Sequence, residues 1–154
     1  MSLYFAYGSN MHRAGMAARC PRARALGVAK LKGWRFIIGT HGYASILPTA
    51  GYEVIGLLWQ LEARDVAALN AYESLDSGLY MRRHLMVRQN GLARSALVYV
   101  GRASGEGRAR PGYLELVLDA ARDWQMPERY IRELKRYAPS CLAAAIAIES
   151  EPVA

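Results

Sequence analysis

The stretch 3–11 places the strongest constraint on the fold, because it joins an apolar, β-prone segment to a Gly-Ser-Asn turn and then to a helical pattern. Ser9 and Asn10 are both good N-cap residues, so a helix is predicted to begin at one of them. Backbone N–H groups at such a junction point into one small volume and suit a carboxylate, a phosphate or an oxyanion. Gly8 permits an unusual backbone angle or the close approach of a ligand. Spacing alone favours the alternative, an ordinary buried strand capped into a helix.

The length of 154 residues predicts a single domain, residues 1–154, with room for a real hydrophobic core. No run of about 18 apolar residues occurs, and the amino terminus lacks a basic segment followed by an apolar region and a small-residue cleavage site. We therefore expect a soluble, cytoplasmic protein with no membrane partner.

The net charge of +7, from 20 basic and 13 acidic residues, raises the question of nucleic-acid binding. The basic residues are scattered, however, with no Lys/Arg run of five and no ribonucleoprotein or zinc-finger motif. The turn at Gly8 also lacks the additional glycines and the lysine of a phosphate-binding loop. No nucleic-acid partner and no nucleotide site are expected.

Several β-prone segments follow one another with few linkers. Residues 25–39 alternate and predict one long bent strand, or two strands broken at Gly33. Residues 43–47 predict a further strand that stops at Pro48, and residues 52–61 a central strand. Residues 79–88 and 92–100 predict a hairpin, because Asn90-Gly91 between them is a strong hairpin signal.

Helical spacing occurs in other parts of the chain. The predicted helices cover residues 10–19, 63–73, about 112–124, and a last one from about 127 that closes before 139. Residues 142–148 fit a closing strand or a last helical turn equally well. Consecutive strands with segregated helices indicate the α+β class, and about six or seven short strands would close most easily into a small mixed β-barrel with flanking helices.

Glu73 is the candidate catalytic carboxylate, because it ends a predicted helix between apolar elements, where partial desolvation would raise its pKa. Spacing alone favours a solvated helix-end glutamate instead. Asp76 is a weaker candidate for the same role. The three histidines have no metal-ligand spacing, and Cys20 and Cys141 form no Cys-x-x-Cys pair, so no metal site and no disulfide framework are predicted.

Two motifs and a strand, in this order, resemble the gamma-glutamylcyclotransferase family. The Tyr-Gly-Ser-Asn segment preceded by Tyr-Phe-Ala is the specific part of the resemblance, and the other segments support it. The matching segments are residues 4–11, 54–61, 72–73, 78–82, 111–113 and 126–130, which together extend over most of the chain. One departure concerns residues 69–74, which read Leu-Asn-Ala-Tyr-Glu-Ser where many relatives have Leu-Asp-x-x-Glu-Gly.

The resemblance implies a small mixed β-barrel and an intramolecular reaction. In that reaction the α-amine of a γ-glutamyl group attacks its own γ-carbonyl, releases an amine or amino acid, and leaves 5-oxoproline. By the same resemblance Glu73 is the general acid/base and Tyr113 closes the pocket. The implied substrate loop consists of Tyr4, Phe5, Ala6, Tyr7, Gly8, Ser9 and Asn10.

This chemistry needs a base and N–H donors for a carboxylate or oxyanion, so we expect no cofactor and no metal. The expected partner is a small γ-glutamyl substrate, and the protein is expected to be a monomer or a homodimer. Two alternatives remain open at this stage. One is a gamma-glutamylamine cyclotransferase or a biosynthetic relative that removes a γ-glutamyl group. The other is a non-catalytic domain that binds a small acid at the turn around Ser9.

Overall fold

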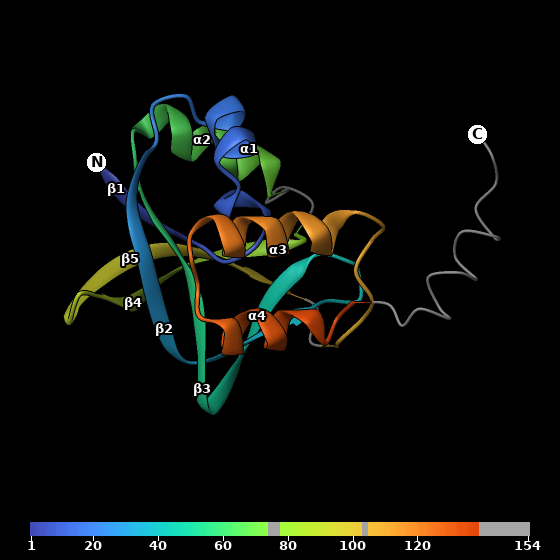
Figure 1. Cartoon of the computed structure of the whole chain (residues 1–154). Helices are drawn as coiled ribbons and strands as arrows, with labels where there is room; N and C mark the ends of the chain where they lie inside the picture. The colour runs from blue at the N-terminus through green and yellow to red at the C-terminus, as the bar shows by residue number, and fades with distance from the viewer. Residues whose placement is uncertain (74–77, 103–104, 139–154) are drawn as a thin grey trace, which may run out of the picture.

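A closed β-barrel forms the centre of the computed structural model, which describes residues 1–73, 78–102 and 105–138 (Figure 1). Within these ranges five strands contribute to the barrel. They are β1 (Ser2–Ala6), β2 (Arg24–Ile38), β3 (Ala44–Leu61), β4 (Tyr80–Gln89) and β5 (Leu92–Gly101). The α+β class and the mixed barrel with flanking helices are therefore confirmed.

The strands follow the order β1-β3-β2-β4-β5 around the barrel. Neighbouring strands are antiparallel except for β1 and β5, which pair in parallel through Tyr4 and Leu97 and close the barrel. The predicted hairpin turns at Asn90-Gly91, so Gln89 pairs with Leu92. Both turn residues have positive φ values, 51° for Asn90 and 80° for Gly91, as a two-residue hairpin of this type requires.

The expected number of six or seven strands was too high, because two long strands replace pairs of short ones. Strand β2 continues through Gly33, where a register shift between Lys32 and Trp34 absorbs the bend. Strand β3 continues through Pro48, which pairs with Trp34 and does not end the strand as predicted. Because two of the strands are long and bent, five strands are enough to close the barrel.

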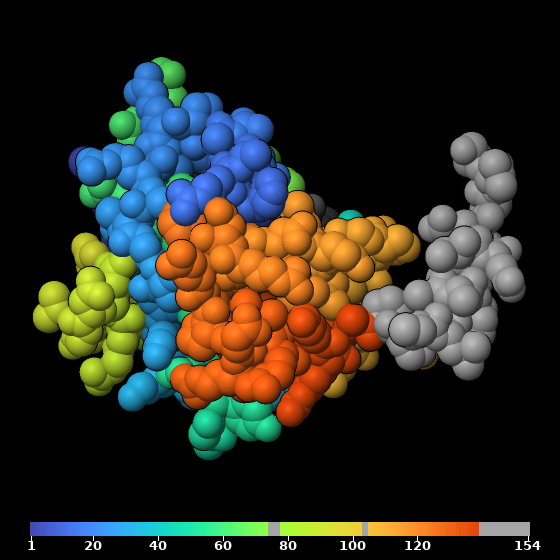
Figure 2. Space-filling view, in the orientation of Figure 1, coloured from blue at the N-terminus to red at the C-terminus, as the bar shows by residue number. Residues whose placement is uncertain are grey.

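Four α-helices lie outside the barrel in the described ranges: α1 (Arg13–Arg19), α2 (Ala63–Tyr72), α3 (Tyr113–Asp123) and α4 (Glu128–Lys135). Helices α1 and α2 lie together at one end of the barrel, whereas α3 and α4 lie side by side across it (Figures 1 and 2). A reciprocal capping box between Glu62 and Asp65 starts α2. None of the described helices is long and apolar enough to cross a membrane.

The first helix differs from its prediction. Residues Ser9–Met11 form a short 3₁₀ helix, η1, and the α-helix begins only at Arg13 with the His12 side chain accepting the Gly15 N–H. Ser9 does not cap a helix, because its side chain is buried and directed to tertiary partners. The predicted element at residues 142–148 lies outside the described residues.

The barrel interior is filled by aliphatic and aromatic side chains from all five strands. Gly56 in β3 shows how closely β1 packs there, since an added Cβ would lie 2.3 Å from the Ala6 carbonyl oxygen and 2.8 Å from the Phe5 ring. Gly56, the glycine in the predicted central strand, therefore lies where strands β1 and β3 approach each other closely. This packing fixes β1, and with it the turn that follows.

Candidate active site

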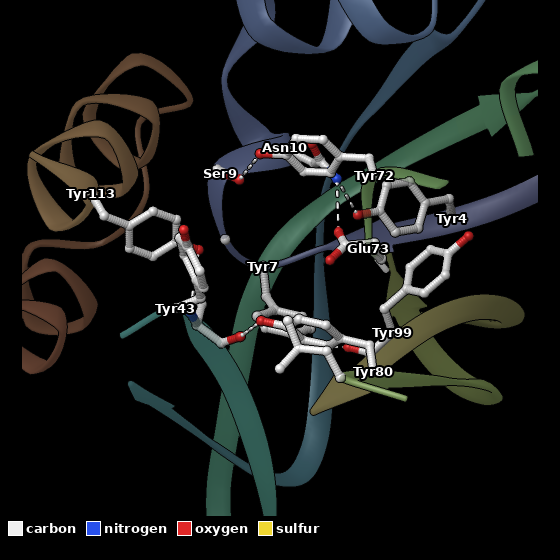
Figure 3. Close-up of a pocket in the computed structure, with 13 residues that line it drawn as sticks. Tyr4, Tyr7, Ser9, Asn10, Tyr43, Tyr72, Glu73, Tyr80, Tyr99 and Tyr113 are labelled. Atoms are coloured by element: carbon white, nitrogen blue, oxygen red, sulfur yellow. Dashed lines mark hydrogen bonds between the residues drawn. The ribbon is translucent and has the colours of Figure 1, made fainter. Parts of the chain in front are cut away.

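A cavity of about 210 Å³ opens where the chain leaves β1, and seven tyrosines contribute to its wall (Figure 3). We call it the tyrosine cavity. Its lining residues are Tyr4, Tyr7, Gly8, Ser9, Asn10, Tyr43, Ala44, Tyr72, Glu73, Leu79, Tyr80, Tyr99 and Tyr113. Segments that are distant in the sequence thus meet at this site.

Among the described residues that line the tyrosine cavity, Glu73 is the acidic one, and it stands at the carboxyl end of α2. The Asn10 side-chain amide donates a hydrogen bond to Glu73 Oε1 at 3.1 Å. Burial raises the pKa of Glu73 to about 7, and the positive charge of Arg19 lowers it in part. A carboxyl group that titrates near neutral pH can both accept and donate a proton under physiological conditions.

Asn10 is held in one orientation by its neighbours. Its Oδ1 accepts a hydrogen bond from Arg19 Nη2 at 2.5 Å, while its Nδ2 donates to Glu73 and to the Tyr4 hydroxyl, the latter at 3.0 Å. Its backbone carbonyl accepts the Trp59 indole N–H at 3.0 Å. Asn10 therefore links the turn after β1 to the carboxylate on α2.

The space around Gly8 at the turn is tight. Its φ of −118° is accessible to any residue, but an added Cβ would lie 2.9 Å from the Tyr113 hydroxyl and 3.0 Å from Ala44 Cβ. The Tyr113 oxygen accepts the Ala44 N–H at 3.2 Å. Burial raises the pKa of Tyr113 to about 12, while the backbone N–H groups of Ala44 and Ser9 lower it. The Ala44 N–H thus donates to an oxygen that lies beside Gly8.

Other tyrosine hydroxyls of the cavity are used for structure. The Tyr7 hydroxyl donates to the Tyr99 carbonyl, and the Tyr80 hydroxyl donates to the Ala44 carbonyl at 2.6 Å. The Tyr99 hydroxyl donates to Asn70 Oδ1 at 2.6 Å, so the asparagine at this position provides an acceptor, as an aspartate would. Burial raises the pKa of Tyr7, Tyr80 and Tyr99, which keeps these side chains uncharged.

The structure brings most of the predicted site residues together. Glu73, Tyr4, Tyr7, Gly8, Ser9, Asn10 and Tyr113 all line the tyrosine cavity. Phe5 and Ala6 are not among its lining residues. Their exposed fractions are 0% and 1%, because the strand turns Phe5 into the core and presses Ala6 against Gly56. Asp76 and the departure at Ser74 lie outside the described residues.

Several lining residues were not among the predicted site residues. They are Tyr43, Ala44, Tyr72, Leu79, Tyr80 and Tyr99. A signal for two of them was present in the predicted hairpin, because counting back from Asn90-Gly91 pairs residue 80 with 101 and residue 82 with 99. This register brings Tyr80 and Tyr99 to the same end of the hairpin. Which face they occupy depends on closure of the barrel.

Comparison with known proteins agrees with this geometry. The model of the family described as "Gamma-glutamyl cyclotransferase, AIG2-like" matches residues 4–126. The chain is 26% identical to the mouse protein named "Gamma-glutamylcyclotransferase" over 162 residues, which covers 98% of this chain and 86% of the relative. The human protein of the same name shows the same identity and coverage.

A solved structure described as "Gamma-glutamyl cyclotransferase" has the same fold. Its TM-score to this chain is 0.83 with 24% sequence identity, and the superposition covers 97% of this chain and 99% of the other. The family match includes both β1 with its turn and Glu73 at the end of α2. The chain thus belongs to the AIG2-like gamma-glutamyl cyclotransferase family.

Proposed function

We propose that this protein is a cyclotransferase that converts the γ-glutamyl group of a small amide or dipeptide into 5-oxoproline and releases the attached amine or amino acid. Glu73 is the general acid/base in this proposal. The observation that carries it is the position of Glu73, whose partly desolvated carboxyl group faces the tyrosine cavity and accepts a hydrogen bond from Asn10 of the turn.

The proposed proton transfers use the raised pKa of Glu73. The ionised carboxylate takes a proton from the α-ammonium group of the substrate, and the free amine then attacks the γ-carbonyl carbon to form the C–N bond of the ring. The bond from that carbon to the leaving nitrogen breaks as Glu73 returns the proton to this nitrogen. The ring nitrogen loses its second proton, so the products are the neutral lactam of 5-oxoproline and an amine that takes up that proton as an ammonium group. A pKa of about 7 suits a group that must carry out both steps.

Charge on the carbonyl oxygen needs hydrogen-bond donors during the attack. The Ala44 N–H, which donates to the Tyr113 hydroxyl beside Gly8, and the nearby Ser9 N–H are the proposed donors. A substrate oxygen in that position would displace the Tyr113 hydroxyl, and the Tyr113 ring would then cover the bound substrate. The neutral tyrosine wall of the cavity would exclude water from the reacting atoms.

The size of the cavity favours a small substrate. A volume of about 210 Å³ suits a γ-glutamyl group with little beyond it, so a large leaving group would extend through the opening. The proposed substrates are therefore γ-glutamyl amines, γ-glutamyl amino acids and short γ-glutamyl peptides.

The test is incubation of the purified protein with a panel of these compounds, α-glutamyl isomers as controls, and quantification of 5-oxoproline. The expected result is 5-oxoproline from at least one γ-glutamyl compound and from no α-glutamyl isomer. Thermal stabilisation by 5-oxoproline without turnover of any compound would instead indicate a binding domain. A Glu73→Gln preparation, purified in parallel, controls for a contaminating activity.

A further inference from the structure

Arg19, the last residue of α1, extends back along its own helix toward the tyrosine cavity. Its guanidinium donates to Asn10 Oδ1 at 2.5 Å and stacks on the Tyr72 ring, with 4.1 Å between the guanidinium carbon and the ring centroid. Tyr72 precedes Glu73 in the chain, and Asn10 donates to the Glu73 carboxylate. From outside the cavity, Arg19 therefore contacts Asn10, which donates a hydrogen bond to Glu73, and Tyr72, which precedes Glu73 in the chain.

The absence of a side chain at Gly15 leaves room for the Arg19 guanidinium. Gly15 lies under the guanidinium, where an added Cβ would be 3.1 Å from Nη2 and 3.4 Å from Nη1. The Arg19 Nε is buried and has no hydrogen-bond partner among the described residues, which is an unfavourable situation for a donor. A long side chain that extended into solvent would avoid this cost. The contacts with Asn10 and Tyr72 offset it.

The donor set of arginine determines how the Asn10 amide points. A guanidinium has five N–H donors and no acceptor, so the amide atom that faces Arg19 must be the oxygen. The NH₂ group then faces Glu73 and the Tyr4 hydroxyl, as observed (Figure 3). Without Arg19, the amide could rotate by 180° and present its oxygen to the carboxylate.

We propose that Arg19 is a positioning residue for the proposed reaction: it orients the Asn10 amide so that the NH₂ group faces Glu73, and it stabilises the ionised form of that carboxylate. A catalytic effect of Arg19 depends on the cyclotransferase activity proposed above. The structural content of the proposal, the coupling of Arg19 to the ionisation of Glu73, can be tested without any substrate.

Among the described residues, the other titratable groups that interact with Glu73 are tyrosines from several elements: Tyr4 of β1, Tyr7 just after it, Tyr80 of β4, Tyr99 of β5 and Tyr113 of α3. Burial raises the pKa of each of them, so they stay neutral over the range in which Glu73 titrates. Burial also raises the pKa of Glu73, and the charge of Arg19 opposes that shift. Removing the charge should therefore raise the pKa of Glu73 further.

The experiment compares Arg19→Met and Arg19→Lys with Arg13→Met. Arg13 is a matched control on the same helix, since it also stacks on an aromatic ring, that of Trp124, and pairs with Asp123 at 2.6 Å, away from Glu73. The readout is the titration of the Glu73 side-chain carboxyl carbon by NMR, with the signal assigned from its absence in Glu73→Gln. The second readout is the pH dependence of kcat/KM.

In Arg19→Met we expect the Glu73 titration to move to higher pH, and kcat/KM on the acid side to fall about tenfold, the lower end of the effect of an opposite charge. The loss should recover as pH rises. Arg19→Lys, which keeps the charge but cannot form the planar fork, should titrate close to the wild-type protein. Arg13→Met should match the wild-type protein in both measurements.

An unchanged Glu73 titration in folded Arg19→Met would overturn the proposal, whatever happened to the rate. If Arg19→Met does not fold, Arg19→Lys decides, because a rise of about one pH unit or more in the Glu73 titration of a variant that keeps the charge would contradict a charge effect. Absence of turnover in the wild-type protein would instead refute the proposed function, while the NMR titration would still report on the coupling between Arg19 and Glu73.

Discussion

Two hollows at the surface of the barrel contain glutamates, and Glu73 in one of them and Glu53 in the other have opposite surroundings. The first is the tyrosine cavity with Glu73. The second, which we call the α4 groove, is a hollow of about 400 Å³ lined by Lys32, Gly33, Gly51, Tyr52, Glu53, Ile55, Arg129, Tyr130 and Glu133. The α4 groove is the larger of the two.

Glu53 in the α4 groove is paired with cations. Lys30 Nζ lies 3.7 Å and Arg129 Nη2 lies 3.4 Å from Glu53 Oε1. Glu73, in contrast, accepts a hydrogen bond from the neutral side-chain amide of Asn10. The Asn10 side chain also separates Glu73 from the Arg19 guanidinium. Glu53 lies beside two cations, whereas desolvation next to a neutral donor raises the pKa of Glu73 to about 7. Volume and charge alone therefore do not decide which hollow is the proposed active site.

The largest expected difference between the hollows is in the rate of turnover. Glu73→Gln keeps the size of the side chain but cannot accept a proton, so we expect kcat to fall by about 10²- to 10⁴-fold. Glu53→Gln is the matched control and should leave kcat unchanged. Measuring 5-oxoproline release by both variants tests this contrast. Near wild-type turnover by Glu73→Gln would remove the distinction between the two glutamates.

A pair of glycine substitutions sharpens the same contrast. Gly8→Ala would place a Cβ 2.9 Å from the Tyr113 hydroxyl, and the displaced ring should reduce kcat/KM by roughly 10- to 100-fold. Gly51 in the α4 groove has open space around it but a φ of +84°. Gly51→Ala should therefore cost about 1 kcal/mol in the free energy of unfolding and leave kcat/KM unaffected.

The two variants distinguish the effect of steric crowding, tested by Gly8→Ala, from the effect of backbone strain, tested by Gly51→Ala. If Gly8→Ala lowered stability while kcat/KM stayed at the wild-type value, the approach of Tyr113 to the turn would have no catalytic meaning. A loss of activity in Gly51→Ala would place part of the function in the α4 groove.

The stability of the two glutamate variants should depend on pH differently. The pKa of Glu73 is raised from 4.5 to about 7 in the folded protein, so the folded state holds this proton more tightly than the unfolded state. The stabilising contribution is complete below about 4.5 and is lost as pH rises through about 7. Between pH 5 and pH 8, the wild-type protein should lose ~1–2 kcal/mol relative to Glu73→Gln, after allowance for partial exposure of the side chain.

Urea unfolding of both proteins at these two pH values measures this difference. Glu53→Gln is again the control, and its difference from the wild-type protein should not show the same loss. A Glu73→Gln difference that was equal at pH 5 and pH 8 would mean that the carboxyl group is effectively solvated.

The smallest expected effect concerns Tyr130, which is buried beside the α4 groove. Its hydroxyl has no hydrogen-bond partner in the described part of the chain. Tyr130→Phe removes this oxygen without changing the ring, so the free energy of unfolding should change by less than about 1 kcal/mol, toward greater stability. Thermal unfolding of the variant checks this. A clear destabilisation would mean that the hydroxyl has a stabilising partner, such as bound water.

The sequence was most informative where the signal was local. The strand, the turn with Gly8 and the helix that ends at Glu73 were recognisable from neighbouring residues, and the hairpin was recognisable from Asn90-Gly91. The resemblance to a family joined the turn and Glu73 into one site. Local patterns could not show that Ser9 would face Tyr72, because burial of that side chain depends on closure of the barrel.

The differences from the predictions arise from tertiary contacts, which local sequence patterns do not show. Pro48 was expected to stop a strand, but tertiary pairing with Trp34 continues the strand through it. Phe5 and Ala6 were included in the substrate loop because they lie inside the motif, and the close packing of β1 against Gly56 buries both side chains. Arg19 was overlooked because its role depends on a side chain that runs back along its helix, which no periodicity reveals.

The pH dependence of kcat/KM in the wild-type protein tests the central claim most directly. If Glu73 is the base, kcat/KM for the best γ-glutamyl compound should rise tenfold per pH unit on the acid side and level off above an apparent pKa of about 7. Glu73→Gln should show no such limb in its residual rate. A profile that is flat from pH 5.5 to 8.5 in the wild-type protein would contradict a catalytic role for a desolvated Glu73.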